Sequence, residues 1–396
     1  MRNSVATAYL KPQREKSLRR RHPWIFSGAV ERVVGDVSPG ATVRVLSHSG
    51  EFLAQAAWSP ASQIRLRAWT FDESAAIDAG FIGDRLEHAI DCRRELGLLD
   101  SAACRLVFSE SDGLPGLIVD RYGDYLVCQF LSAGIEAWRD EVVAYLQRSL
   151  SAQGIFERSD AAVRRKEGLA ASTGVLAGTP PPQPLELEIE GLIQRLDLTH
   201  GQKTGAYLDQ RFNRLRVARF ACGRRVLDAY SYSGAFGLHC LQAGATDATF
   251  IDSSTAALES LRCASEINGL AAPCHSIRGD VAETLRALRD AGKRFDLIVL
   301  DPPKFVHTAE QLTKGCRAYK DVNRVAFEVL SPNGVLASFS CSGHVDASLL
   351  QKVIAQAAQE AGRDARILER LEQPPDHPVA LRFPESAYLN GFILRA

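Results

Sequence analysis

Residues 225–237 read RVLDAYSYSGAFG, and this stretch decides the fold of the C-terminal half of the chain. Its first five residues, Arg225–Ala229, have an apolar centre that suits a buried strand. The glycines that follow permit a tight turn, and the apolar residues around them suit the start of a helix. A strand, a glycine-containing turn and a helix form the first unit of a doubly wound α/β sheet.

The same alternation continues towards the C-terminus. Its clearest strand, Leu297–Leu300, lies in the apolar run FDLIVL, which is typical of a strand buried on both faces. The other expected strands, each followed by helical spacing, are Thr249–Asp252, Ser276–Gly279 and Gly334–Ser340. We therefore predict an α/β fold with a Rossmann-like, doubly wound and mostly parallel sheet in this half.

The N-terminal half contains short β segments first and a mixed pattern afterwards. The predicted strands are Ala41–Leu46, Phe52–Trp58, Ile64–Trp69, Cys104–Phe108, Leu117–Val119 and Tyr125–Phe130, with helices within Asp72–Leu98 and Trp138–Leu150. The small, proline-rich stretch Ala170–Pro184 predicts a connector. We expect a β-rich domain at 1–72, a central α+β domain at 73–186 and the α/β domain at 187–396.

The composition is that of a globular protein, with 46% hydrophobic and 24% charged residues. The 47 Lys and Arg residues balance 47 Asp and Glu residues, so the net charge gives no signal for nucleic acid. No apolar run reaches the roughly 18 residues that a membrane helix needs. The first residues lack the apolar core of a signal peptide, and we expect a cytoplasmic protein.

Nine cysteines and nine histidines are scattered along the chain, and no Cys-x-x-Cys pair occurs. This distribution argues against a zinc site and against a disulfide framework. We therefore expect no metal, and most cysteines should be small buried side chains.

Acidic residues lie at or directly after the carboxyl ends of the first three strands of the α/β half, where open parallel sheets bind ligands. Asp228 precedes the turn Ser231–Gly234, and an acid ahead of the glycines suits an ammonium group better than a pyrophosphate. Asp252 suits the hydroxyls of a ribose and Asp280 an exocyclic amine. The pattern fits S-adenosylmethionine better than NAD. The structural alternative is helix N-capping, by Ser233 after the first strand, by Asp252 or Ser253 after the second and by Asp280 after the third.

Two prolines directly after the fourth strand, in LDPPKF, fix the direction of Asp301. Asp301 can then face the edge of a base, and Phe305 offers a ring on which a base can stack. A purely structural Asp-Pro-Pro turn is the alternative.

Cys341 follows the fifth strand in SFSCSG, and it is the one cysteine at the carboxyl end of a predicted strand facing this crevice. A thiol there can attack C6 of a pyrimidine and so make C5 nucleophilic. A cation such as Lys304 would favour the thiolate. The alternative is a small packed side chain.

The N-terminal segment is basic, and this local charge can bind phosphates although the whole chain is neutral. Its candidate RNA contacts are Lys16, Arg19, Arg20 and Arg21. The alternative is a solvated terminus without a partner.

Taken together, these motifs resemble the bacterial large-subunit ribosomal RNA cytosine-C5 methyltransferases of the RlmI type. Residues 14–30 and 59–71 are similar to a PUA RNA-binding domain, and residues 109–130 to the central domain of that family. HGQKTGAYLDQR (200–211), DAYSYSGAFG, LDPPKF and SCSG are similar to motifs of its class I methyltransferase domain.

The resemblance implies a role for each matching residue. The implied cofactor-binding residues are Asp228, Tyr230, Ser231, Ser233, Gly234, Asp252, Asp280 and Tyr207. The implied catalytic residues are Asp301, which orients the cytosine, and Cys341, which forms the adduct at C6. The implied contacts to RNA are Lys304, Phe305, Arg211, Lys16, Arg19, Arg20 and Arg21. The implied partner is 23S ribosomal RNA, naked or in a large-subunit precursor, with a homodimer left open.

Two alternatives stay open at this point. DPPKF is also similar to the signature of RNA amine or purine-ring methylases, which need no thiol. Pro302-Pro303 stands where many cytosine-C5 methylases have a second cysteine, a feature that the RlmI type shares, so the resemblance implies a single-cysteine mechanism in which the base that removes the C5 proton is not identified. A non-catalytic RNA-binding or ribosome assembly factor would keep the fold without the chemistry.

Overall fold

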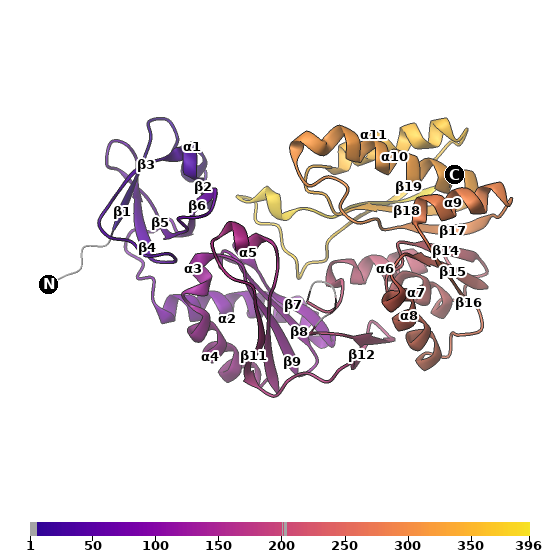
Figure 1. The fold of residues 1–396 in the computed structure, drawn as a ribbon, viewed down its shortest axis with the longest axis horizontal. Helices are drawn as coiled ribbons and strands as arrows, with labels where there is room; N and C mark the ends of the chain where they lie inside the picture. The colour runs from indigo at the N-terminus through magenta and orange to yellow at the C-terminus, as the bar shows by residue number, and fades with distance from the viewer. Residues whose placement is uncertain (1–5, 200, 202–203) are drawn as a thin grey trace. The chain divides into compact units, whose positions relative to one another are not determined.

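The structure of the protein is a computed structural model that describes residues 6–199, 201 and 204–396. The chain divides into two compact units (Figure 1). Unit 1 comprises the described residues up to Leu185 together with Leu196–Leu208 and Pro375–Ser386. Unit 2 comprises Glu186–Arg195, Asp209–Pro374 and Ala387–Ala396. The division into three domains that we expect from the sequence stays a prediction.

The first part of unit 1 forms a six-stranded sheet in the order β2-β6-β5-β4-β1-β3. The elements are β1 (Thr7–Leu10), α1 (Lys16–Arg19), β2 (Trp24–Phe26), β3 (Val30–Val34), β4 (Thr42–Leu46), β5 (Phe52–Trp58) and β6 (Ile64–Thr70). Alternate residues such as Val43, Val45 and Leu66 point into one apolar core, as the period of two along a strand requires. The three strands predicted here agree with the structure to within one residue.

The second part of unit 1 forms a five-stranded sheet in the order β11-β10-β9-β8-β7. Its strands are β7 (Ala103–Phe108), β8 (Leu117–Tyr122), β9 (Tyr125–Phe130), β10 (Gly154–Ser159) and β11 (Ser172–Gly178). Its helices are α2 (Ala79–Glu95), α3 (Ala133–Glu136), α4 (Arg139–Leu150) and α5 (Val163–Lys166). Helices α2 and α4 pack against each other, and α2 packs on β7.

Strand β11 corrects the sequence prediction, which assigned Ala170–Pro184 to a connector. Residues Ser172–Gly178 instead pair antiparallel with β10 at the edge of the sheet. None of the side chains in this edge strand is fully buried, so the strand forms without the apolar alternation that marks a buried one.

Unit 2 contains a seven-stranded sheet in the order β16-β15-β14-β17-β18-β20-β19. Its strands are β14 (Arg225–Ala229), β15 (Asp247–Asp252), β16 (Cys274–Arg278), β17 (Phe295–Leu300), β18 (Leu330–Ser340), β19 (Arg366–Glu372) and β20 (Asn390–Arg395). Strands β14 to β18 pair in parallel, whereas β20 pairs antiparallel with both β18 and β19. The predicted α/β fold with a mostly parallel, Rossmann-like sheet is confirmed.

Helices cover both faces of this sheet (Figure 1). They are α6 (Arg211–Ala218), α7 (Ala235–Gln242), α8 (Thr255–Ile267), α9 (Val281–Asp290), α10 (Leu312–Val329) and α11 (Ala347–Glu360). One apolar cluster joins α9, α10 and α11 to Leu227 and Ala229 of β14, and we call its side of the sheet the α10 face. The other joins α6, α7 and α8 to Val226 of the same strand, on the α7 face. A separate two-stranded hairpin is formed by β12 (Leu185–Ile189) and β13 (Leu192–Leu196).

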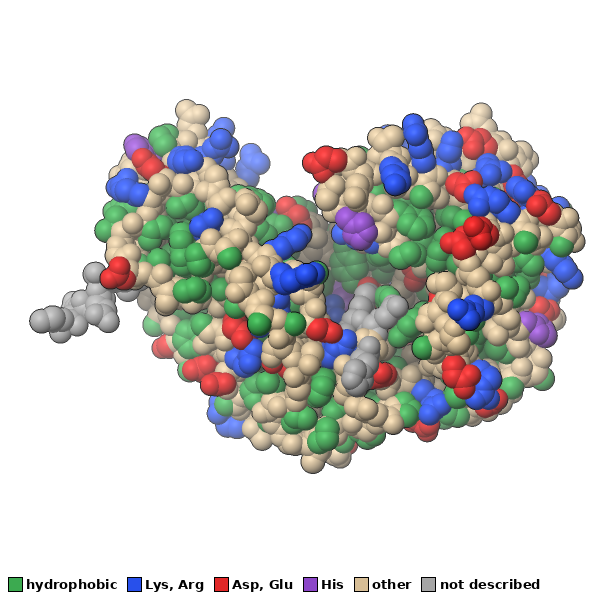
Figure 2. Space-filling model, in the orientation of Figure 1, with side chains coloured by type: hydrophobic (Ala, Val, Ile, Leu, Met, Phe, Trp, Pro, Cys, Tyr) green, Lys and Arg blue, Asp and Glu red, His purple; other side chains and the backbone are tan. Residues whose placement is uncertain are grey.

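The described helices are each too short or too polar to cross a bilayer. Basic and acidic side chains are interspersed over the face of the molecule that Figure 2 shows, in agreement with the formal net charge of zero.

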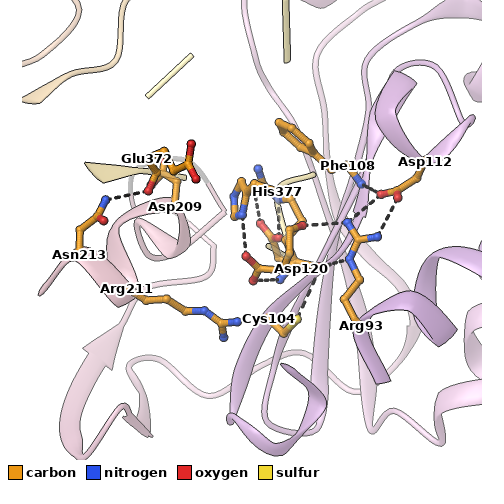
Figure 3. Close-up of polar contacts among 12 residues, drawn as sticks. Arg93, Cys104, Phe108, Asp112, Asp120, Asp209, Arg211, Asn213, Glu372 and His377 are labelled. Atoms are coloured by element: carbon orange, nitrogen blue, oxygen red, sulfur yellow. Dashed lines mark hydrogen bonds and ion pairs between the residues drawn. The ribbon is translucent and has the colours of Figure 1, made fainter. Parts of the chain in front are cut away.

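The segment Pro375–Ser386 connects β19 to β20 but packs within unit 1, where it meets the fully buried side chain of Arg93 (Figure 3). The guanidinium of Arg93 donates two hydrogen bonds to Asp112, of 2.7 and 2.8 Å, and one of 2.8 Å to the carbonyl oxygen of Asp376. Its two remaining N–H groups donate to the carbonyl oxygens of Arg105 and Ala89. All five donors of Arg93 are therefore used.

Candidate active site at the strand ends of unit 2

The carboxylate of Asp228 lies on the α7 face of the sheet. Asp228 is opposite Phe250 of β15 and opposite Val299 of β17 in the strand register, and both of these side chains belong to the α7 cluster. Because side chains alternate along a strand, Asp252 and Asp301, two residues further on, fall on the same face at the carboxyl ends of their strands.

Cys341 completes this arrangement. Its half-buried side chain packs against the α7 cluster, two residues beyond Phe339 of the same cluster. The sulfur lies 3.9 Å from the carbonyl oxygen of Pro302, which follows Asp301 at the end of the neighbouring strand β17. The structure thus brings Asp228, Asp252, Asp301 and Cys341 to one edge and one face of the sheet.

Asp228 is a buried carboxyl group with a perturbed pKa. Its Oδ2 accepts a hydrogen bond of 2.9 Å from the backbone N–H of Gly237, and the residue is 1% exposed. Burial raises the pKa of Asp228 to about 7, against the hydrogen bond from Gly237, and the nearby charges of Asp301 and Asp252 raise it further. A cationic group placed here would favour the carboxylate form.

The turn after β14 is held in an unusual backbone conformation. Tyr230 and Tyr232 have positive φ values of 64° and 49°, and Gly234 has a φ of 78°. The carboxylate of Asp252 accepts a 2.8 Å hydrogen bond from the N–H of Tyr232 and another of 2.8 Å from the N–H of Ser254. Left-handed backbone at non-glycine residues persists where the surroundings enforce it, and it is common at binding sites.

Ser231 carries a buried hydroxyl that has no hydrogen-bond partner among the described residues. The residue is 8% exposed, and its backbone N–H is already bonded to the carbonyl oxygen of Ile251. A buried hydroxyl without a partner costs free energy, so Ser231 is suited to a polar group of a ligand.

Two glycines allow helix α7 to begin this close to β15. A side chain on Gly234 would place its Cβ 2.3 Å from Leu261 Cδ1, and one on Gly237 would place it 2.3 Å from Phe250 Cε1. Gly234 itself is the N-cap of α7, so the alternative role of Ser233 as that cap is wrong. Ser233 lies half-buried in the turn beside it.

Asp280 is the N-cap of α9, where its side chain accepts a hydrogen bond of 3.0 Å from the N–H of Glu283. The structural alternative for this residue therefore holds in the structure. The cap uses Oδ1, and the carboxylate retains further acceptor capacity.

The residues after Asp301 form a loop with an exposed Lys304 and a half-buried Phe305. The ring of Phe305 packs on Tyr319 of α10, with ring centres 4.7 Å apart, and edge-on to Tyr230 at 6.3 Å. Part of the Phe305 ring therefore packs against protein side chains, and the prediction that a base stacks on this ring stays a prediction.

Arg211, expected to contact RNA, is fully buried at the start of α6. Its guanidinium lies 3.8 Å from Glu190 and over the ring of Phe212. This buried position gives no support to a contact with RNA, and that role of Arg211 stays a prediction.

Tyr207 lies half-buried in the segment Leu196–Leu208, which belongs to unit 1. Its expected role at the cofactor stays a prediction. The neighbouring motif residues His200, Gln202 and Lys203 lie outside the described residues.

The four basic residues predicted to contact RNA, Lys16, Arg19, Arg20 and Arg21, are exposed on α1 and directly after it. Arg19 forms an ion pair of 2.5 Å with Glu51, which offsets part of the positive charge. The nine cysteines include no disulfide, and no group of three metal-ligating side chains occurs among the described residues.

Sequence reasoning missed Tyr319, whose hydroxyl group lies between Ser340 and Ser342, the neighbours of Cys341. The available signal was its place on the apolar stripe of α10, which indicates only a core position.

Comparisons with known proteins identify the family of this chain. Residues 8–71 match the family model of a PUA-like domain, and residues 164–389 match that of an S-adenosylmethionine-dependent methyltransferase. Two similar curated proteins are named ribosomal RNA large subunit methyltransferase I. The protein from Aeromonas salmonicida is 48% identical over 98% of both chains, and that from Aeromonas hydrophila is 48% identical over 99% of both.

Solved structures show the same fold over the full length. A protein from Streptococcus mutans, assigned as a SAM-dependent methyltransferase, matches 99% of this chain and 100% of its own with a TM-score of 0.84 at 22% identity. A second solved structure, of a protein assigned as a methyltransferase in complex with SAH, matches this chain with a TM-score of 0.85 at 22% identity. The chain belongs to the ribosomal RNA large subunit methyltransferase I family, whose members are enzymes that use S-adenosylmethionine.

Proposed function

We propose that this enzyme methylates C5 of a cytosine in 23S ribosomal RNA, through a covalent bond between Cys341 and C6 of the base. The observation that carries the proposal is the position of the Cys341 sulfur, 3.9 Å from Pro302 O, at the same edge and face of the sheet as the cofactor carboxylates. The shared name of the similar curated proteins supports a large-subunit ribosomal RNA substrate.

The cofactor residues fit S-adenosylmethionine on two observations. Asp228 is a buried carboxyl that an ammonium group would convert to its charged form, and Ser231 has a buried hydroxyl that a polar group would satisfy. Asp252 and Asp280 would accept hydrogen bonds from the ribose and the adenine, with Tyr230, Ser233 and Gly234 shaping the turn between them. The cofactor supplies an electrophilic methyl group.

The chain's own residues would activate the base in balanced steps. The thiolate of Cys341 adds to C6 of the cytosine, and the electron pair of the C5=C6 bond moves to C5, which takes the methyl group as its bond to the sulfonium breaks and leaves a thioether. Asp301 would accept a hydrogen bond from the amino group of the base or, when protonated, donate one to the ring nitrogen. Loss of the C5 proton to a base then restores the double bond, and the C6–sulfur bond breaks to return the thiolate.

Positive charge on exposed side chains would bind the RNA backbone. The exposed residues Lys16, Arg20, Arg21 and Lys304 suit phosphates, and a PUA-like domain at residues 8–71 suits RNA. Contacts of this kind release counterions, so binding should weaken as salt rises. The target base must leave its stack to reach the sheet edge.

Product identification tests the proposal directly. We expect purified enzyme, S-adenosylmethionine and unmodified 23S ribosomal RNA, naked or in precursor particles, to yield 5-methylcytidine, measured by mass spectrometry of the digested nucleosides. RNA that already carries the modification is the control and should take up no further methyl group. A product methylated on an exocyclic amine or a purine ring would contradict the proposal.

Substituting Asp228→Asn should weaken binding of S-adenosylmethionine by about 10- to 100-fold, because a charge-assisted hydrogen bond is lost. In the wild type, affinity should rise from pH 6 to pH 7.5 as Asp228 ionises, since burial raises its pKa to about 7. Calorimetric titration of both proteins at both pH values measures the dissociation constant for S-adenosylmethionine. The ratio of the variant's constant to that of the wild type at each pH removes the contribution of the cofactor's own ionisation. Asp247→Asn, at the opposite end of β15, is the matched control.

The same shift has a consequence for stability without ligand. The folded-state pKa of Asp228 is raised above the usual value of 3.8, so the folded state binds the proton more tightly than the unfolded state. The stabilisation is complete below about pH 4 and is lost as the pH rises towards 7. The melting temperature of Asp228→Asn should therefore fall less between pH 5 and pH 8 than that of the wild type. An equal fall in both proteins would contradict a buried Asp228 that titrates in this range.

A further inference from the structure

The side chain of Tyr319 joins the two residues on either side of Cys341. Its hydroxyl oxygen accepts a hydrogen bond of 3.0 Å from Ser340 Oγ and lies 3.0 Å from Ser342 Oγ. Ser340, Ser342 and Tyr319 each have 0% exposed surface. The three hydroxyl groups form a buried hydrogen-bonded network beside the half-buried cysteine.

The alternation of side chains explains why this network lies on the face of the sheet opposite the Cys341 thiol. Tyr319 belongs to the cluster on the α10 face, whereas Cys341 packs against the α7 face. The serines before and after Cys341 therefore point towards α10 while the thiol points the other way. Holding both neighbours fixes the direction of the side chain between them.

Tyr319 also contacts the loop that follows Asp301. Its ring packs on Phe305 at 4.7 Å between centres, and the N–H of Val306 donates a 3.4 Å hydrogen bond to Ser342 Oγ. One turn earlier in α10, Gly315 permits close packing, because a Cβ there would lie 2.2 Å from Val306 Cγ2. Helix α10 is thus tightly packed against residues 305 and 306.

The loop after β17 and the loop after β18 therefore both contact the side chain of Tyr319. One carries Asp301 and Pro302, the other carries Cys341, and the sulfur of Cys341 lies 3.9 Å from the carbonyl oxygen of Pro302. Burial raises the pKa of Tyr319, so its hydroxyl stays neutral and donates to one partner while it accepts from the other. A fully buried phenol cannot touch a substrate, which leaves a role through Cys341.

We propose that Tyr319 is a positioning residue, which sets the direction of the Cys341 thiol and its distance from Asp301. This inference rests on the proposed function, in which Cys341 attacks the base. Small errors in the placement of a nucleophile cost large factors in rate. Loss of the phenol hydroxyl should therefore slow the attack and leave the binding of cofactor and RNA intact.

The test is Tyr319→Phe, which keeps the ring on Phe305 and removes only the hydroxyl. We expect kcat to fall about 10- to 100-fold, with KM for RNA and Kd for S-adenosylmethionine within twofold of wild type. RNA with 5-fluorocytidine at the target position traps the adduct, because fluorine cannot leave as a proton does. The rate of adduct formation should fall by the same factor as kcat.

A second readout does not require the reaction. Alkylation of Cys341 by iodoacetamide, followed by peptide mass spectrometry between pH 6 and pH 9, reports how the thiol is held. We expect at least threefold faster alkylation in Tyr319→Phe, because the sulfur is no longer held beside Pro302. Combining Tyr319→Phe with Ser340→Ala should slow adduct formation no further, since both changes break one network.

Val325→Ala is the matched control, because it removes buried volume from the same helix without touching the hydroxyl network. It should retain kcat and the wild-type alkylation profile. The inference is overturned by Tyr319→Phe with wild-type kcat and alkylation, or by an equal loss in Val325→Ala. A wild type that forms neither adduct nor 5-methylcytidine would overturn the proposed function instead, and the alkylation profile would still decide the role of Tyr319.

Discussion

Replacing Cys341 by alanine should lower the methylation rate by at least about 1,000-fold, because the base then lacks a nucleophile at C6 and C5 stays unreactive. Binding of S-adenosylmethionine should remain within twofold, since the cofactor carboxylates Asp228 and Asp252 lie on other strands. Methyl transfer to 23S ribosomal RNA and calorimetric titration of the cofactor measure the two quantities separately.

Cys274→Ala is the matched control for this substitution. Cys274 is also half-buried, but it begins β16 and so lies at the amino end of the parallel strands, opposite the pocket. This variant should keep full activity. Turnover retained in Cys341→Ala would remove the covalent route and favour the alternative of amine methylation through the Asp301 loop.

Replacing Arg93 by alanine should destabilise unit 1 by about 3–5 kcal/mol, which makes it the largest stability change that we expect. The substitution leaves the carboxylate of Asp112 buried without its cation, and it leaves the carbonyl oxygens of Arg105 and Asp376 without donors. Asp112 has only 8% of its side chain exposed, so bulk solvent compensates its charge poorly.

Thermal and urea unfolding measure this loss, and hydrogen exchange at residues 374–378 shows whether the segment containing Asp376 is released. Arg94→Ala is the control, because this neighbour is 61% exposed and pairs with Asp91 on the same helix. It should change stability by less than about 0.5 kcal/mol. Equal melting temperatures for Arg93→Ala and Arg94→Ala would show that the buried network contributes nothing.

The strands of the α/β half could be predicted because their physical signal is local. FDLIVL must be apolar on both faces to lie inside a covered sheet, and β14 matches the predicted Arg225–Ala229 in both bounds. The carboxyl-end residues follow from the strands, since a parallel sheet collects these ends at one edge. The family resemblance added the roles, which neither periodicity nor spacing supplies.

Other features could not be predicted because their cause is not local. Strand β11 has an exposed edge position, so Ser172–Gly178 needs no apolar pattern to form. Arg211 is basic and looks available in the sequence, but it is buried beside Glu190 after folding. Tyr319 reaches Ser340 and Ser342 only through the crossover from α10 to β18, over 21 and 23 positions.

The packing of residues 375–386 within unit 1 implies an order of assembly during protein synthesis. Arg93 and Arg105 are made early, but the backbone carbonyl and carboxylate of Asp376 that bind them emerge from the ribosome only after about 270 further residues. A nascent chain released before that point would present a half-satisfied N-terminal unit, open to proteases and chaperones. Residues that are synthesised late thus complete the hydrogen bonds of the N-terminal unit, and we expect a chain truncated before Asp376 to be degraded before it binds RNA.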